Sequence, residues 1–112
     1  MPYEPTNPDA INPGKWERRK AFYFDENIAL MMGYYDEAPE ECIGMRWMEA
    51  EGPQGYPVTR GYPQWMVTPD KLALYMLEGI ERDFDQDRAR GYIRDEQEFR
   101  RALEYIRGKT AA

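Results

Sequence analysis

The sequence predicts an α+β fold, with a small antiparallel sheet of about three strands covered by two C-terminal amphipathic helices. Two observations carry this prediction. Short runs of aromatic and apolar residues, separated by glycine and proline, fill the centre of the chain, and apolar residues recur every three to four positions in its last third. Strand-like segments followed by helix-like segments are typical of α+β proteins.

The chain has 112 residues, a length that corresponds to one domain. Residues 1–14 contain four prolines and few residues suited to a core, so we expect a flexible N-terminal tail there. Apolar residues make up 42% of the chain, which is enough to offset the entropy lost on folding for most of its length. We therefore expect a single α+β domain over residues 15–112.

Three segments are predicted strands, at residues 20–24, 42–49 and 64–67. The first has the aromatic density of a strand, and a long connection containing prolines joins the second to the third. Alternation along the second strand gives the sheet one apolar face and one face that is only half polar. The apolar face carries Ile43, Met45 and Trp47, and the half-polar face carries Cys42, Gly44, Arg46 and Met48.

The apolar run at residues 28–32 permits two interpretations. Its composition favours a short helix that Asp25 would cap and Gly33 would end, and we prefer this slightly. The alternative is a strand that forms a hairpin with residues 20–24.

The last third of the chain contains start signals for two helices. Thr68 is suited to cap the first helix, because a proline follows it and can occupy the first helical position. Asp95 begins the second, Glu98 completes a capping-box pattern, and Gly108 is expected to end it. The helices are predicted at residues 69–84 and 95–107, with apolar stripes formed by Leu72, Met76, Ile80 and Phe84 and by Phe99, Ala102, Leu103 and Ile106.

The residue types that most enzymes use are missing from this chain. It has no histidine and no serine, and Cys42 is its one cysteine, so the usual general base, the common nucleophile pairs and the zinc ligands are absent. Its glycines form no phosphate-binding pattern. We therefore predict a non-catalytic protein that uses no cofactor and no metal.

At residues 83–87, acids alternate with other residues, as they do at the start of a calcium-binding loop. The match fails at Arg88, where the loop needs glycine, and at Arg94, where it needs a glutamate. We expect a solvated helix end instead, with the acids paired to neighbouring arginines.

The protein is predicted to be cytoplasmic. One cysteine permits no internal disulfide, and the first residues lack the basic and apolar segments of a signal peptide. No apolar run approaches the roughly 20 residues that cross a bilayer.

A loop rich in tyrosine and proline is one candidate contact surface. Gly-Tyr-Pro occurs at residues 55–57 and again at 61–63, and these rigid amphipathic side chains are typical of binding hot spots. An alternative is that the tyrosines fold back over the sheet while the prolines stiffen an edge. The candidate contact residues are Tyr56, Arg60, Tyr62 and Trp65.

An acidic segment is the other candidate surface. The net charge is −6, and residues 25–51 hold eight acids against one base. Such a surface argues against direct binding of nucleic acid or anionic membranes, which need clustered cations, and favours a basic protein partner. The cluster could also be only a solubilising face, or in its sharpest form a mimic of nucleic acid. The candidate residues are Asp36, Glu37, Glu40 and Glu41.

Taken together, these features predict a small acidic protein-binding module, an inhibitor or accessory protein that acts on a basic or nucleic-acid-binding partner. Two alternatives stay open. The half-polar strand face would suit a self-associating structural subunit, and paired carboxylates would suit an enzyme. The chain is similar in general style to accessory proteins of phages and mobile elements, and it carries no motif that identifies a family.

Overall fold

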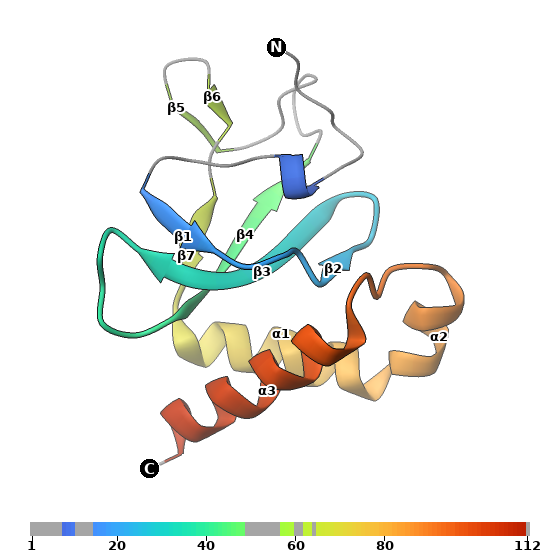
Figure 1. Ribbon diagram of the computed structural model, residues 1–112. Helices are drawn as coiled ribbons and strands as arrows, with labels where there is room; N and C mark the ends of the chain where they lie inside the picture. The colour runs from blue at the N-terminus through green and yellow to red at the C-terminus, as the bar shows by residue number, and fades with distance from the viewer. Residues whose placement is uncertain (1–7, 11–14, 49–56, 60–61, 64, 112) are drawn as a thin grey trace.

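The computed structural model describes residues 8–10, 15–48, 57–59, 62–63 and 65–111. It is an α+β fold in which a curled antiparallel sheet lies on two long helices (Figure 1). The spatial order of the sheet is β1-β3-β4-β7, and β2 also pairs with β3. The strands are β1 (Trp16–Arg18), β2 (Tyr23–Phe24), β3 (Ile28–Tyr35), β4 (Cys42–Trp47) and β7 (Met66–Thr68), and β5 (Val58–Thr59) pairs separately with β6 (Tyr62–Pro63). The helices are η1 (Pro8–Ala10), α1 (Asp70–Arg82), α2 (Phe84–Ala89) and α3 (Glu96–Thr110).

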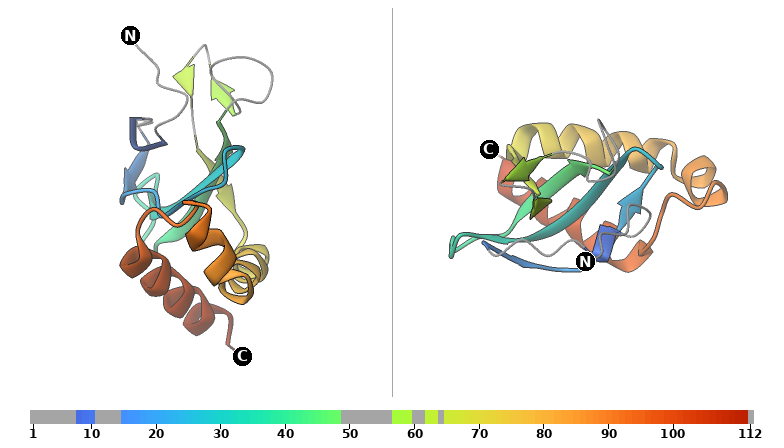
Figure 2. Two further views of the ribbon diagram at one scale, coloured as in Figure 1. Left: turned by 90° about the vertical axis from the view of Figure 1, so that its right-hand side faces the viewer. Right: turned by 90° about the horizontal axis from the view of Figure 1, so that it is seen from above.

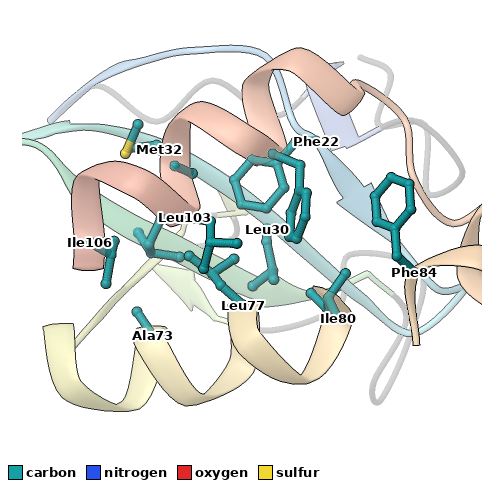
Figure 3. Close-up of a cluster of buried hydrophobic side chains, with 12 residues drawn as sticks. Phe22, Leu30, Met32, Ala73, Leu77, Ile80, Phe84, Leu103 and Ile106 are labelled. Atoms are coloured by element: carbon teal, nitrogen blue, oxygen red, sulfur yellow. The ribbon is translucent and has the colours of Figure 1, made fainter. Parts of the chain in front are cut away.

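Helices α1 and α3 cover one face of the sheet, as their apolar stripes predict. Figure 3 shows Leu77 of α1 and Leu103 of α3 pointing toward Leu30 of β3. The rings of Phe84 and Phe99 stack with centroids 5.5 Å apart and close one end of this core. Each such large apolar side chain contributes roughly 1.5–3 kcal/mol when it is fully buried. This cluster fixes α1 against the sheet.

A second core cluster closes the opposite face of the sheet. Trp16 of β1 and Trp65, which precedes β7, pack there with Met31 and Met48, and the Trp16 indole donates a hydrogen bond to the Trp65 carbonyl. A Cβ on Gly44 would lie 2.6 Å from Met31 Cε and 3.1 Å from Trp16 Cη2, so a larger residue here would require these side chains to shift. The face that alternation predicts as half polar is therefore covered by the chain itself.

Residues 8–10, which belong to the predicted tail, are held against the domain. Pro8 is fully buried, and the Asp9 carboxylate accepts a hydrogen bond of 2.7 Å from the Ala21 amide. Asp9 also lies 3.8 Å from the Arg94 guanidinium. This part of the tail is therefore attached to the segment that leads into β2.

The helix preferred at residues 28–32 is wrong, because these residues form the start of β3. β3 is the central strand, with β1 and β2 on one side and β4 on the other. Residues 29–33 are all buried, since helices cover one face of the strand and the second cluster covers the other. A strand buried on both faces loses the alternation that would have revealed it. The hairpin alternative is correct.

The boundaries of several other elements also differ from the prediction. Among the described residues, the main sheet has five strands instead of about three, because β1 was not expected and β3 was expected only in the alternative interpretation. The strand predicted at residues 20–24 is shorter, since β2 contains only Tyr23 and Phe24. β4 ends at Trp47, and β7 is displaced to Met66–Thr68. The first predicted helix is interrupted at Asp83, which separates α1 from α2. The second continues past Gly108 to Thr110.

Candidate functional site

A groove opens between α1 and the hairpin of β2 and β3, at the end of the sheet nearest α2. It has a volume of about 330 Å³. In Figures 1 and 2, α2 lies next to this end of the sheet, and a backbone bridge between Tyr23 and Ile93 holds the segment after α2 beside β2. The residues that line the groove are Tyr23, Asp25, Ile28, Leu30, Met76, Gly79, Ile80, Arg82, Asp83 and Asp87.

The floor of the groove is apolar. Ile28 and Leu30 reach it from β3, and Met76 and Ile80 reach it from α1 at helical spacing. All four belong to the core or pack against it, so the floor is part of the packed interior. Gly79 lies in the wall, and a Cβ there would meet nothing within 4 Å, so the absent side chain leaves this wall open.

Three carboxylates surround one end of the groove. Asp25 comes from the hairpin turn, Asp83 from the junction of α1 and α2, and Asp87 from α2. Among the described residues, one base, Arg82, lines the same end and lies 3.6 Å from Asp83. The charge at this end of the groove is therefore net negative.

The Asp25 carboxylate is fixed by the turn that it forms. Its Oδ1 accepts hydrogen bonds from the amides of Asn27 and Ile28, and its Oδ2 accepts a bond of 3.2 Å from the Tyr23 hydroxyl. Glu26, at the tip of the turn, has a left-handed φ of 78°, which this hydrogen-bonded turn holds in place. Asp25 is thus an anchor for the hairpin as well as a member of the groove.

The acids of the groove perturb one another. Burial raises the pKa of the Tyr23 phenol, and the negative charges of Asp25 and Asp87 raise it further. Burial also raises the pKa of the Asp87 carboxyl, the charge of Asp83 adds to this shift, and Arg90 opposes it. Negative charge is therefore concentrated where a cation would relieve it.

The tyrosine-rich loop predicted as a contact surface is only partly described. Tyr56 and Arg60 lie outside the described residues, and for Tyr62 the structure gives the backbone of β6 alone. Trp65 differs from the expectation, because its side chain is 3% exposed within the second core cluster. Its large apolar ring is covered by the chain itself, so Trp65 has a packing role here.

The acidic residues predicted as an electrostatic surface lie on the connection between β3 and β4. Asp36, Glu37 and Glu40 are exposed, and the first two have left-handed φ values of 53° and 63°. This connection follows the end of β3, whereas the groove lies at its beginning. The acidic connection and the groove are therefore two separate surfaces.

Glu41 differs from its neighbours because its carboxylate is buried. Its side chain is 6% exposed and accepts a bond of 2.6 Å from Arg19 and two bonds of 3.2 Å from Arg101. Arg101 also pairs with Glu98, and Lys109 donates to the Glu41 carbonyl. Glu41 thus fastens the β3–β4 connection to α3 and is not available to a partner.

Within the described residues, no group of acids and cysteine could hold a metal ion. Residues 84–89 form α2 instead of a calcium loop. Likewise, no helix in the part of the chain that the structure covers is long and apolar enough to span a membrane.

Comparison with known proteins finds no matching family model, curated protein or solved structure.

Sequence reasoning did not find the groove, because its walls come from segments about 50 residues apart. Asp83 and Asp87 stood out only as part of an incomplete calcium pattern. The helical spacing of Met76, Gly79 and Asp83 was the remaining signal, since it places a gap and an acid beside an apolar side chain on one side of a helix.

Proposed function

We propose that this protein is a small non-catalytic protein-binding module, and that the groove beside α1 holds part of a basic partner protein. The carrying observation is the combination of an apolar floor with three carboxylates at one end. Apolar contact supplies affinity in such a site, and complementary charge supplies orientation and rapid association. The net charge of −6 assists the approach of a basic partner.

The exposed acids Asp36, Glu37 and Glu40 add a second negative surface at the other end of β3. They support the same class of partner through steering, because exposed charges act mainly on the rate of encounter. Tyr56, Arg60 and Tyr62 stay candidate contacts of the tyrosine-rich loop.

The test is capture of binding proteins from the native cell by tagged wild-type protein and two variants. Asp83→Lys/Asp87→Lys reverses two charges in the groove, and Asp85→Lys reverses an exposed charge on α2 that does not line it. We expect a basic protein to be captured by wild type and by Asp85→Lys, to be lost with the groove variant, and to be retained less at high salt. Mass spectrometry identifies what is captured.

Three results would count against this proposal. Equal capture by all three proteins would move the partner to another surface. A partner whose capture does not depend on salt would favour the tyrosine-rich loop over the groove. Recovery of only the protein itself would favour a self-associating structural subunit.

A second candidate function is a carboxylate-based enzyme. It is favoured by one observation, the raised pKa of Asp87 beside Asp25 and Asp83 in one groove, since general acids and bases are tuned in this way. Asp87→Asn keeps the shape of the side chain and removes its titration. Turnover of a panel of glycoside, ester and phosphodiester substrates that is lost in Asp87→Asn would support catalysis, and no turnover by wild type would exclude it for these classes.

A further inference from the structure

The groove continues into an exposed apolar strip along the helix-facing side of the sheet. The register pairs Ile28 with Trp47 and Leu30 with Met45, and Met45 pairs in turn with Met66 at the edge strand β7. Directly paired residues lie side by side on one face of a sheet. The apolar floor of the groove therefore extends across β4 to β7.

Helix α1 borders the same strip. Leu72 and Tyr75 precede Met76 and Gly79 by four residues each, so they lie along the same side of α1 as the groove wall. The opposite side of α1 is occupied, because Glu78 and Glu81 pair with Arg107 of α3. α1 thus presents one side to α3 and the other to the groove and the strip.

The large apolar side chains of the strip and of this side of α1 are unusually exposed. Trp47, Met66, Leu72 and Tyr75 are each between 40% and 57% exposed. Large exposed apolar patches are rare on small proteins, and they commonly mark interaction sites. The acids lie at the α2 end of this surface, and the apolar strip lies toward the start of α1.

We infer that the occupant is a short linear segment of a partner protein in which large apolar side chains stand next to a lysine or arginine. The basic side chain lies at the α2 end, against Asp83 and Asp87, and the apolar side chains lie along Met76 toward Trp47 and Met66. This inference rests on the proposed function and adds the chemistry and the direction of the bound segment. Charge complementarity selects the basic residue, and the apolar strip selects its neighbours.

The test is selection from a phage-displayed library of random 12-residue peptides on the wild-type protein, with removal of phages that bind Asp83→Lys/Asp87→Lys. We expect enriched sequences with lysine or arginine beside large apolar residues. A synthetic enriched peptide should bind the groove variant at least about tenfold more weakly than wild type, a loss of about 1.4 kcal/mol. Asp85→Lys should bind it within about twofold of wild type, since it lies outside the groove.

Methyl-labelled methionines then show where the peptide binds. Met76, Met45 and Met66 border the groove and the strip, and Met31 and Met32 are fully buried elsewhere in the two cores. We expect the first three methyl signals to shift on titration with the peptide and the last two to stay in place.

Enriched sequences without a basic residue, absence of any enriched sequence, or shifts confined to other methionines would overturn the inference. The proposed function fails separately, in the capture experiment. A basic partner captured through the groove, together with a library that yields no basic and apolar consensus, would leave the function standing and overturn only this description of the bound segment.

Discussion

The buried carboxylate of Glu41 predicts an asymmetry between two substitutions in one ion network. Glu41 is 6% exposed, whereas its partners Arg101 and Arg19 are 38% and 47% exposed. Arg101→Met leaves a buried negative charge with one partner. Glu41→Met leaves two arginines that reach water and can pair with Glu98, which lies 3.0 Å from Arg101 and 3.8 Å from Arg19.

The magnitude follows from which charge is left buried. Removing one partner of a buried pair costs about 3–5 kcal/mol of unfolding free energy. Arg19 still donates to Glu41 in Arg101→Met, and Arg101 is itself partly solvated, so we expect a cost of about 2–3 kcal/mol. Replacing the buried acid by methionine should cost about 0–1 kcal/mol. The double variant should be close to Glu41→Met, since the buried charge of Glu41 is gone and Glu98 keeps Arg19 at 3.8 Å.

Urea unfolding of the four proteins at pH 7 measures these differences without adding salt. The pH dependence gives a second readout. Burial alone would raise the pKa of Glu41, but hydrogen bonds from Arg101 and Arg19 hold it below its ordinary value of 4.5. The stability from these bonds is therefore complete above pH 4.5 and lost as the pH falls through the lowered pKa.

The difference between wild type and Arg101→Met should accordingly shrink as the pH falls through the lowered pKa of Glu41, because its carboxyl becomes neutral there. Equal costs for Arg101→Met and Glu41→Met, or a difference that does not change with pH, would refute the reasoning that a buried charge dominates this network.

Four further substitutions test the packing and the helices. Gly44→Ala should destabilise the protein by about 1–3 kcal/mol in urea unfolding, because the new methyl would crowd Trp16 Cη2, 3.1 Å away, and the end of a methionine; unchanged stability would show that these layers can separate freely. Asp95→Ala should cost about 1 kcal/mol and speed amide exchange in the first turn of α3, since the carboxylate caps that helix; no change would mean that the cap contributes nothing. Gly79→Ala and Gly108→Ala should each stabilise the protein by about 0.5–1 kcal/mol, because both glycines lie inside helices with open space around them; a loss of stability would contradict that geometry.

The helices were predictable because each buries one side only. Of the predicted α1 stripe, Ile80 and Phe84 are buried in the core, whereas Leu72 is exposed and Met76 lines the groove, and Leu77 is buried in their place. The Asp95 carboxylate accepts a hydrogen bond from the Glu98 amide, as the capping pattern predicts. The start of α1 was less predictable. Pro69 occupies the cap position, and Thr68, which was expected to cap the helix, instead has a buried hydroxyl without a hydrogen-bond partner among the described residues.

The sheet was harder to predict because it is covered on both faces. Both faces of β3 are buried, with Met31 in one cluster and Met32 in the other. Its apolar residues are therefore consecutive, and the sequence lacks the alternation that would distinguish a strand from a helix. β1 has three residues and only Trp16 as an apolar anchor, which is too short for a pattern. The groove combines residues from distant segments, so no local signal could specify it, and the burial of Glu41 depends on arginines 22 and 60 residues away in sequence.

The most direct test of the groove as the binding site is to fill it without changing its charge. Gly79→Trp places a large side chain in the open wall, and Gly108→Trp places the same side chain on an exposed position of α3 as a control. Both positions have room for a Cβ, so both variants should fold. We predict that Gly79→Trp loses the captured partner and the selected peptide while Gly108→Trp binds both as wild type does. Undiminished binding by folded Gly79→Trp would show that neither the partner nor the peptide binds in the groove.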